Sequence, residues 1–441
     1  MEENVTHSRI IIAGGGVGGL ALAQGLKRAG LGVRLLERQV SGGPGGYRLH
    51  MNGDGGNALQ ALLPPELFEL YLDTSRVDPN QEHLLILDKQ LRKLASRKHL
   101  GAQTTNRRKD TAVNRGTLRQ ILLTGLDDVV EAGEVLSFEE RSDAVEVVLS
   151  DGRRLTCDVL VGFDGVHSRI RAGRLPQAQV MDTGLFGIYG RTPLTPDLAR
   201  SLPAHLFDGF VLVFGPQLLE GGMLALGAFD PRTKVAGAAA RRQVRTRLDP
   251  VEPYMMLGAG IPATILESLR IRPEAASKEQ LKQALQSLVR GWDKAIVDMV
   301  DRAPASELFA TKARYIDPPD NWTPGRVTLA GDAIHAMPPS LGVGANLALR
   351  DAQLLAEALI TLKSWDRPSI VAAIGSYEAK MRDYAFPLLR RAITQEGMAS
   401  GFTPLGILRL VRMVGLGNVI RASRTRNQIS RPVDITEMEP S

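Results

Sequence analysis

The stretch RVTLAGDAIHAMPPSLGVGANLALRD occupies residues 326–351 and decides how the fold of this chain is interpreted. Its apolar residues 327–330 predict a short buried strand, and Gly331 and Asp332 stand where that strand would end. Two prolines and a glycine-rich segment follow, and they predict a turn that leads into a helix. In open α/β sheets, ligands bind outside the carboxyl ends of the strands. We therefore expect Asp332 to lie at a binding crevice.

A second glycine-rich turn lies near the start of the chain, where residues 14–19 read GGGVGG. It follows a predicted strand at 10–13 and precedes a predicted helix at 20–29 and a strand at 33–36. In a G-x-G-x-x-G motif the first glycine makes the turn, the second admits a pyrophosphate, and the third lets the helix pack on the strand. Glu37, after the second strand, would accept hydrogen bonds from an adenosine ribose and repel a 2′-phosphate. The pattern predicts a half-site for the AMP part of FAD or NAD, with a purely structural turn as the alternative.

A third motif, Asp164-Gly165, follows the continuous apolar run 159–163, which is typical of a buried parallel strand. An aspartate at that position would also point into the crevice at the carboxyl ends of the strands. Ser168 is placed to cap the next helix, and Arg171 to pair with Asp164 or with a phosphate. A helix cap with a salt bridge, and no ligand, is the alternative interpretation.

The segment after Asp332 suits the flavin end of a dinucleotide. Asp332 suits a ribityl chain, and Pro338 with its neighbour fixes the backbone beside a flat ring. Gly342 and Gly344 allow close approach, and Asn346 offers N–H and C=O groups to the pyrimidine edge of an isoalloxazine. A helix N-terminus there would stabilise an anionic reduced flavin. The alternative is a capped helix after a proline turn.

The remaining segments predict a second, mainly β layer inserted into the first α/β unit. The expected strands of this layer are 210–214, 223–229 and 254–259, with a helix at 278–292. A hairpin is expected from 84–87 and 90–95, a helix at 115–126, and a β-meander from 129–138, 144–149 and 154–156. Helices are expected at 345–362, 369–391 and 405–421.

Composition describes an ordinary globular protein, because 44% of its 441 residues are hydrophobic and 23% are charged. The single cysteine, Cys157, excludes an internal disulfide framework and fits a reducing compartment. The first strand begins so early that no signal peptide is expected, and no apolar run reaches the ~18–20 residues that span a bilayer. Aromatic residues do not interleave the basic ones, and zinc-finger spacing is missing. We therefore expect a cytoplasmic protein with no metal, no nucleic acid and no stable membrane association.

Together, the three motifs resemble those of the single-component FAD-dependent aromatic hydroxylases, the class A flavoprotein monooxygenases with the para-hydroxybenzoate hydroxylase fold. The resemblance covers roughly residues 8–390 and includes tetracycline-modifying and polyketide-tailoring members. It implies an α/β fold: a FAD-binding Rossmann-like domain with a parallel sheet and a β-meander, an inserted mainly β substrate domain, and C-terminal helices. The implied FAD-binding domain comprises 1–78, 100–182 and 322–375, the substrate-binding domain 79–99 and 183–321, and the C-terminal helical segment 376–441.

The resemblance also implies which residues bind FAD. They are Gly14, Gly16, Val17, Gly18, Gly19, Glu37, Arg38, Arg115, Asp164, Gly165, Ser168, Arg171, Gly331, Asp332, Pro338, Gly342, Val343, Gly344, Ala345 and Asn346. Family members often carry Gly-Gln-Gly before this asparagine, and Val343 replaces the glutamine here, which puts a side-chain contact at that point in doubt.

The activity that the resemblance implies is monooxygenation. NADPH or NADH would reduce FAD, and the reduced FAD would react with O2 to give a C4a-hydroperoxide. Since that species is an electrophile, we expect an electron-rich aromatic or polyketide-like small molecule as substrate. A Baeyer–Villiger or antibiotic-inactivating monooxygenase of the same fold is one alternative, and a non-catalytic flavoprotein that binds FAD or a small molecule is another. The expected assembly is a monomer or homodimer.

Four residues are candidates for contact with the substrate or the reacting ring. Residues 47–51 alternate, so that Arg48 and His50 would share one face of a strand near the flavin. Arg48 would contact flavin, NAD(P)H or an anionic intermediate, or else form a structural ion pair; His50 is more often a satisfied interior histidine. Tyr189 and Arg191 are expected on a strand that faces the ring.

Overall fold

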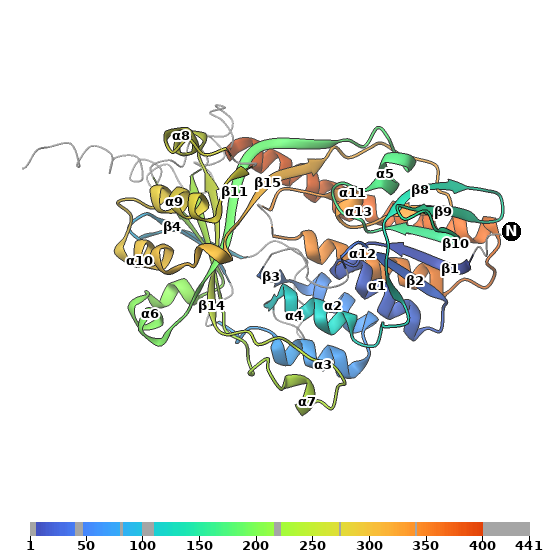
Figure 1. Cartoon of the computed structure of the whole chain (residues 1–441), viewed down its shortest axis with the longest axis horizontal. Helices are drawn as coiled ribbons and strands as arrows, with labels where there is room; N and C mark the ends of the chain where they lie inside the picture. Colours follow the sequence, from blue (N-terminus) through green and yellow to red (C-terminus); the bar gives the residue numbers. More distant parts are fainter. Residues whose placement is uncertain are drawn as a thin grey trace, which may run out of the picture.

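The computed structural model describes residues 6–39, 47–79, 83–98, 110–215, 222–272, 275–339 and 342–399. The expected helix 405–421 lies outside these residues. The described chain forms two units, each built on its own sheet, and two long strands run between them (Figure 1).

The first unit contains a seven-stranded sheet in the described part of the chain, with the order β7-β2-β1-β10-β9-β8 and β16 beside β10. Its strands are β1 (Thr6–Ala13), β2 (Val33–Glu37), β7 (Val130–Ala132), β8 (Val135–Glu140), β9 (Val145–Leu149), β10 (Arg154–Gly162) and β16 (Val327–Leu329). β7, β2, β1, β10 and β16 are parallel, whereas β8 and β9 form an antiparallel meander with the start of β10. The parallel sheet and the meander are both confirmed.

Two boundaries in this sheet differ from the expectation. β10 is one continuous strand, although the runs 154–156 and 159–163 were expected as two. Cys157 in its middle is fully buried and pairs with both Ser8 of β1 and Val145 of β9, so the chain stays extended where the partner changes. The expected strand 129–138 is divided into β7, which pairs with β2, and β8, which pairs with β9.

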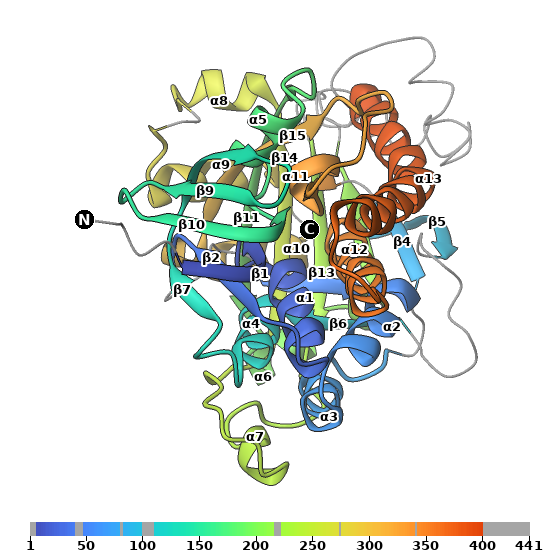
Figure 2. The ribbon, with the colours of Figure 1, turned by 90° about the vertical axis from the view of Figure 1, so that its right-hand side faces the viewer.

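A layer of helices packs against this sheet. α1 (Val17–Arg28) packs against α12 (Gly344–Ile360), and α12 packs against α2 (Gly53–Leu62) and α13 (Arg367–Ala399) (Figure 2). α3 (Pro65–Thr74) and α4 (Arg115–Leu123) complete the layer. None of the described helices combines the length and the apolar character needed to cross a membrane.

The second unit contains a seven-stranded sheet within the described residues, with the order β15-β11-β14-β13-β12-β4-β5. Its strands are β4 (His83–Asp88), β5 (Lys93–Lys98), β11 (Val180–Pro193), β12 (Phe210–Phe214), β13 (Met223–Phe229), β14 (Tyr254–Ile261) and β15 (Phe309–Ile316). Helices α8 (Ala263–Ser268), α9 (Lys278–Leu288) and α10 (Lys294–Arg302) cover its outer face, and the inner face is turned toward the first unit (Figure 1). The inserted, mainly β layer is therefore confirmed.

A two-stranded ribbon, β3 (Arg48–Met51) with β6 (Thr111–Asn114), lies between the two units. β11 runs across the expected domain boundary at residues 182 and 183, and α13 runs without a break across residues 375 and 376. The three-part division of the chain remains a proposal, and its last boundary falls inside a helix.

Candidate functional site

The carboxyl ends of four parallel strands meet at one edge of the first sheet. β2 ends at Glu37, β1 leads into Gly14, β10 leads through Phe163 into Asp164, and β16 leads into Gly331. The pairing of neighbouring strands places these ends side by side. The structure thus brings the three sequence motifs together at the crevice predicted for them.

The glycines of the first turn have separable roles. A Cβ on Gly14, whose φ is +111°, would collide with the Phe163 carbonyl oxygen, and a Cβ on Gly19 would collide with the Gly14 oxygen. A Cβ on Gly18 would meet the Ala348 carbonyl oxygen of α12 at 2.9 Å. A Cβ on Gly16, in contrast, would have nothing within 4 Å, and this residue precedes α1 without a side-chain cap. The close packing at Gly14, Gly18 and Gly19 therefore requires glycine. The open space at Gly16 fits an approaching pyrophosphate at the helix N-terminus.

Glu37 lies across this turn from the helix N-terminus. Its Oε2 accepts a hydrogen bond from the Gly15 N–H at 2.5 Å, and its Oε1 accepts one from the Gln39 N–H at 2.9 Å. The carboxylate is therefore held in place beside the open position at Gly16, where a ribose would lie. The neighbouring Arg38 is 79% exposed and lies 3.8 Å from Glu134, so it borders the crevice mouth.

The Asp164-Gly165 turn carries an unusual buried carboxylate. Asp164 Oδ2 accepts from the N–H groups of Arg169 at 2.9 Å and Ile170 at 3.4 Å, while Oδ1 is buried without a hydrogen-bond partner among the described residues. Burial raises the pKa of Asp164. Ser168 accepts from the Arg171 N–H at 2.9 Å, so it caps α5 (Arg169–Arg174) as predicted. The orphaned oxygen beside the strand ends fits a polar group of a ligand.

Arg171 joins this turn to the Gly331-Asp332 turn. Its Nε donates to the Ala178 carbonyl at 3.0 Å, its Nη1 to Ala333 at 2.9 Å and its Nη2 to Val166 at 2.8 Å. All three nitrogens are engaged by backbone, so the guanidinium holds the two turns at a fixed spacing rather than pairing with Asp164 by a direct hydrogen bond.

The Gly331-Asp332 turn presents its carboxylate to the crevice. Gly331 adopts φ 57° and ψ −142°, and Asp332, the first residue of α11 (Asp332–His335), is exposed. Arg115, which opens α4, is half-buried, and its backbone N–H donates to the Tyr47 carbonyl at 2.7 Å. Burial lowers the pKa of Arg115, and the nearby charge of Asp332 opposes that shift. An arginine and an aspartate from distant segments therefore face the same space.

The start of α12 supplies backbone groups rather than side chains. Pro338 is buried, Gly342 has φ +64°, and Val343 is 2% exposed and packs into the main hydrophobic core. Gly344 and Ala345, the first residues of the helix, are half-buried, and no side chain caps it. The departure at Val343 is thus a core contact, and the helix N–H groups are left for a ligand.

The Asn346 side chain is fully buried and has protein partners. Its Oδ1 accepts from the Asn52 N–H at 2.9 Å, and its Nδ2 donates to the His50 carbonyl at 2.8 Å. Asn346 therefore attaches β3 and the start of α2 to α12. Its side chain is thus engaged by the protein, and its backbone belongs to the first turn of α12.

A polar and aromatic cluster on the inner face of the second sheet faces the crevice. Arg191 binds Glu307 through Nε at 2.9 Å and Nη2 at 3.1 Å, and its guanidinium lies over the rings of Tyr47 at 5.0 Å and Tyr254 at 5.6 Å. The Tyr47 hydroxyl also donates to the Glu307 carboxylate at 2.9 Å. The Arg191 hydrogen bond lowers the pKa of Glu307, whereas burial and then Glu307 raise the pKa of Tyr47. We call Arg191, Glu307, Tyr47 and Tyr254 the Arg191 cluster.

Tyr189 and the remaining candidates lie around this cluster. Tyr189 stacks on Phe309 with ring centroids 5.8 Å apart. Arg48 is 7% exposed, approaches the Gly209 carbonyl at 3.4 Å, and lies over Phe210 at 5.8 Å. His50 lies 3.7 Å from Asp110, which favours its interpretation as an interior histidine.

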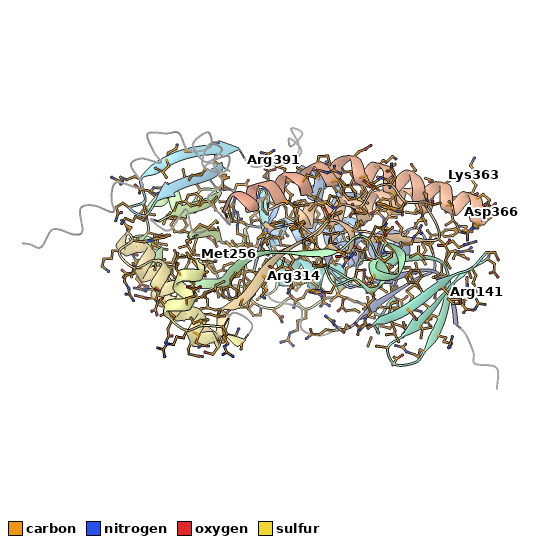
Figure 3. All side chains as sticks on the ribbon, turned by 90° about the horizontal axis from the view of Figure 1, so that it is seen from above. Arg141, Met256, Arg314, Lys363, Asp366 and Arg391 are labelled. Atoms are coloured by element: carbon orange, nitrogen blue, oxygen red, sulfur yellow. The ribbon has the colours of Figure 1, made fainter. Side chains whose placement is uncertain are left out.

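The sequence interpretation missed Glu307, Tyr254 and Phe309 as members of this face. No motif surrounds Glu307, and the strand β15 that contains Phe309 was not expected. Tyr254 begins the expected strand 254–259, but nothing in the sequence said which face of the sheet it would join. Tyr47 was adjacent to a candidate, and its position one residue before β3 was the available clue. Met255 packs in the core on the outer face of the sheet, whereas Met256 packs with Phe229 and Tyr254. Figure 3 labels Met256 on the second sheet.

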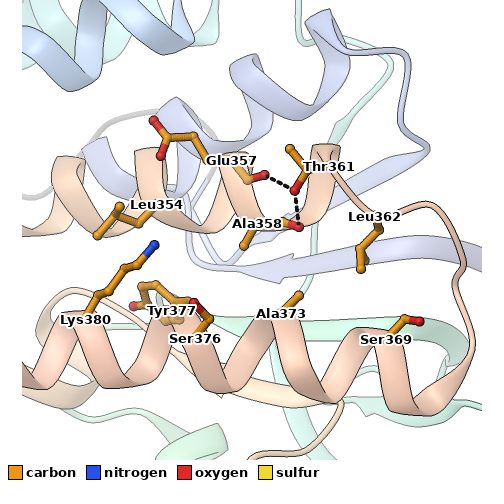
Figure 4. A pocket seen from close by; sticks show the side chains of 10 residues that line it. All are labelled: Leu354, Glu357, Ala358, Thr361, Leu362, Ser369, Ala373, Ser376, Tyr377 and Lys380. Carbon is orange, nitrogen blue, oxygen red and sulfur yellow. Dashed lines mark hydrogen bonds between the residues drawn. The ribbon is translucent and has the colours of Figure 1, made fainter.

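The hollow between α12 and α13, of about 410 Å³, is a separate feature of the surface (Figure 4). Leu354, Ala358, Leu362 and Ala373 give it an apolar floor, and Glu357 and Lys380 border it. None of the residues of the three motifs lines it, so it is not part of the candidate site.

Comparisons with known proteins agree with this geometry. A family model described as FAD binding domain matches residues 118–392. The dual O-methyltransferase/FAD-dependent monooxygenase CTB3 of Cercospora beticola is 29% identical over 401 residues, which cover 85% of this chain and 44% of that protein. The aurachin C monooxygenase/isomerase of Stigmatella aurantiaca is 26% identical over 378 residues, covering 85% of each chain.

Solved structures show the same fold. A crystal structure of an FAD-containing protein from Photorhabdus luminescens superposes with a TM-score of 0.72 at 26% identity, covering 89% of this chain and 98% of that one. The chain spans less than half the length of CTB3. The match in sequence and the match in fold both extend over the two units described above.

Proposed function

Because the chain belongs to the FAD binding domain family, the class A FAD-dependent hydroxylases and monooxygenases, we propose that it is a monooxygenase that uses NAD(P)H and O2 on an electron-rich aromatic or polyketide-like small molecule. FAD is the cofactor of this family. One observation supports the proposal most strongly. Glu37, Asp164 and Asp332 meet at the ends of neighbouring parallel strands, and the aromatic face of the second sheet lies opposite them.

The described residues fit FAD along its whole length. Glu37 would hold the adenosine ribose, and the N–H groups at the start of α1 would bind the pyrophosphate beside Gly16. Asp332 would accept hydrogen bonds from the ribityl hydroxyls, with Arg115 close by. The start of α12 would place its positive helix end at the ring and stabilise negative charge there. When bound, FAD supplies the redox chemistry, which is reduction by NAD(P)H followed by transfer of one oxygen atom from O2.

The inner face of the second sheet suits a flat organic substrate. Gly187, Gly227, Gly258 and Ala225 on this face make room for larger side chains: the Tyr189 ring lies over Gly258, and Arg48 lies over Gly227. Tyr189 also stacks on Phe309, so that two aromatic rings border the face. Aromatic walls of this kind bury a large apolar area and orient planar ligands. The chain's own part in catalysis is then to orient the substrate, exclude water and hold the cofactor, as expected where the cofactor performs the chemistry.

The test is reconstitution of the purified protein with FAD, followed by measurement of NAD(P)H oxidation with panels of phenols, anilines, indoles and aromatic polyketides. The proposal expects flavin absorption bands, faster NAD(P)H oxidation with a true substrate, and one atom of labelled O2 in the product. If FAD binds and no compound accelerates its reduction, the non-catalytic binding protein gains support. Product analysis separates hydroxylation from Baeyer–Villiger insertion, because insertion adds the oxygen between two carbon atoms.

A further inference from the structure

A buried polar group lies directly behind the Gly331-Asp332 turn. Asp351, on α12, has its Oδ2 2.6 Å from the Gly331 nitrogen, which donates to it, and 2.7 Å from His335 Nε2. The Tyr384 hydroxyl of α13 donates to the other carboxylate oxygen of Asp351. We call Asp351, His335 and Tyr384 the Asp351 cluster. The three residues come from three different helices and meet at the backbone of one turn.

Burial of the Asp351 cluster costs free energy of folding. The side chains of Asp351 and His335 are both fully buried. Burial alone would lower the pKa of His335, but the charge and hydrogen bond of Asp351 outweigh it and the pKa is raised. His335 Nδ1 has no hydrogen-bond partner among the described residues. Since apolar residues of similar volume often replace buried ion pairs without loss of stability, stability alone is a poor reason for this group.

The turn that the cluster holds is closely packed and has a backbone conformation that favours glycine. Gly331 has φ +57°, and a Cβ there would lie 3.2 Å from the Ala348 Cβ. The hydrogen bond from its N–H to Asp351 fixes this conformation from the α12 side. The Tyr377 hydroxyl of α13 donates to the Leu329 carbonyl at 3.0 Å, and Arg171 holds the Ala333 carbonyl. The turn is thus held before, at and after Gly331, and the next residue, Asp332, is left exposed.

We propose that Asp351 is a positioning residue for FAD: it holds the Gly331 N–H, braced by His335 and Tyr384, so that the Asp332 carboxylate is directed at the cofactor. The inference rests on the proposed contact between Asp332 and the ribityl chain. It assigns Asp351 in the middle of α12 and Tyr384 in the middle of α13 to the support of the cofactor site, although neither side chain touches FAD in the proposed arrangement.

The test compares isosteric variants by FAD affinity and by stability. Asp351→Asn and Tyr384→Phe remove the charge and the hydroxyl from the Asp351 cluster. Glu378→Gln is the matched control, because Glu378 is also a buried carboxylate of the helix layer. Its oxygen accepts from the Thr328 hydroxyl at 2.9 Å and not from the Gly331 N–H. FAD dissociation constants are measured by titrating apoprotein with FAD and following flavin fluorescence, and apoprotein melting temperatures are measured alongside.

We expect Asp351→Asn to weaken FAD binding by about 10-fold or more, as for loss of a charge-assisted hydrogen bond, and Tyr384→Phe by less. Glu378→Gln should change the melting temperature without changing the dissociation constant. If Asp351→Asn lowers only the melting temperature and the folded apoprotein binds FAD as the wild type does, the residue is structural and the proposal is overturned.

A double-mutant cycle with Asp332→Asn shows whether Asp351 acts through Asp332. The proposal expects the double variant to lose clearly less affinity than the sum of the two single losses. Additive losses would contradict it. If wild-type protein does not bind FAD at all, the proposed function fails first; if it binds FAD and Asp332→Asn has no effect, the positioning role fails while FAD binding stands.

Discussion

Two glycines of one motif have opposite physical roles, and the structure separates them. A Cβ at Gly19 would collide with the backbone of Gly14, whereas a Cβ at Gly16 would point into open space. Both residues match the same sequence pattern, so the pattern alone cannot say which one serves folding and which one serves the ligand.

We therefore predict different outcomes for Gly19→Ala and Gly16→Ala. Gly19→Ala should destabilise the apoprotein by about 1–3 kcal/mol, because the helix must move away from the turn. Gly16→Ala should leave apoprotein stability nearly unchanged but weaken FAD binding by about 10-fold, because the methyl group occupies the approach of the pyrophosphate. Denaturant unfolding and FAD titration of both variants check this, and an unchanged FAD affinity in Gly16→Ala would contradict the assignment.

Asp164 gives a prediction about pH. Because burial raises its pKa in the fold, the native state binds a proton that the unfolded chain releases above pH 3.8. The contribution of Asp164 to stability therefore falls as pH rises from 3.8 through the raised value. Asp164→Asn removes this loss. The melting temperature of the variant apoprotein minus that of the wild-type apoprotein should therefore increase between about pH 4 and about pH 7. A constant difference over that range would show that Asp164 does not titrate there.

At the scale of elements, the Arg191 cluster connects the ribbon at β3 to the second sheet. Tyr47 precedes β3, Arg191 belongs to β11, and Glu307 lies just before β15. The bidentate geometry and the two flanking rings favour a planar guanidinium over an ammonium group. The cluster thus joins the strand that would lie near the cofactor to the face that would hold the substrate in the proposed arrangement.

We predict that Arg191→Gln destabilises the protein by about 1–3 kcal/mol, because the half-buried Glu307 loses both charge-assisted hydrogen bonds. Arg302→Gln is the control: it breaks an ion pair with Asp197 in which both side chains are about half exposed, so little change is expected. Chemical denaturation measures both variants. Equal effects would mean that the Arg191 cluster is no stronger than a surface ion pair.

Elements with a local signature were predictable from the sequence, and those defined by distant partners were not. The βαβ start and the strands β12, β13 and β14 were predicted because apolar runs stand between glycine or proline turns. β15 was missed because Lys312 and Arg314 interrupt its pattern; it forms by pairing with β11. The continuity of β10 was missed because it depends on pairing with β1 along both halves, while the neighbour on its other edge changes from β9 to β16.

At the scale of the whole molecule, the candidate cofactor site joins residues from nearly the full length of the described chain. Gly16, Glu37 and Asp332 were predicted because each follows a strand and carries a recognisable motif. Arg191 was a candidate by itself, but its partners Glu307 and Tyr254, and the Asp351 cluster, could not be predicted, since these contacts depend on how separate segments pack. The sequence therefore located what would touch the cofactor but not what supports those contacts.

This long-range assembly predicts that FAD stabilises the protein as one body. Bound at 100 times its dissociation constant, FAD should stabilise the native state by about 2.7 kcal/mol, because it binds the folded chain alone. Calorimetric melting of apoprotein and FAD-loaded protein should show a single transition that moves to higher temperature. If only part of the unfolding signal moves, the second unit unfolds independently of the cofactor site.

The crossing of α1 and α12 has a consequence for cofactor choice. The two helices lie close together at Gly18 and Ala348: a Cβ on Gly18 would be 2.9 Å from the Ala348 carbonyl oxygen and 2.6 Å from the Phe163 ring. One helix begins at the expected pyrophosphate and the other at the expected ring. Because this contact prevents α1 and α12 from sliding along each other, the fold sets the distance between their two ends. A mononucleotide such as FMN would reach only one end, so the protein should select its cofactor by length as well as by chemistry.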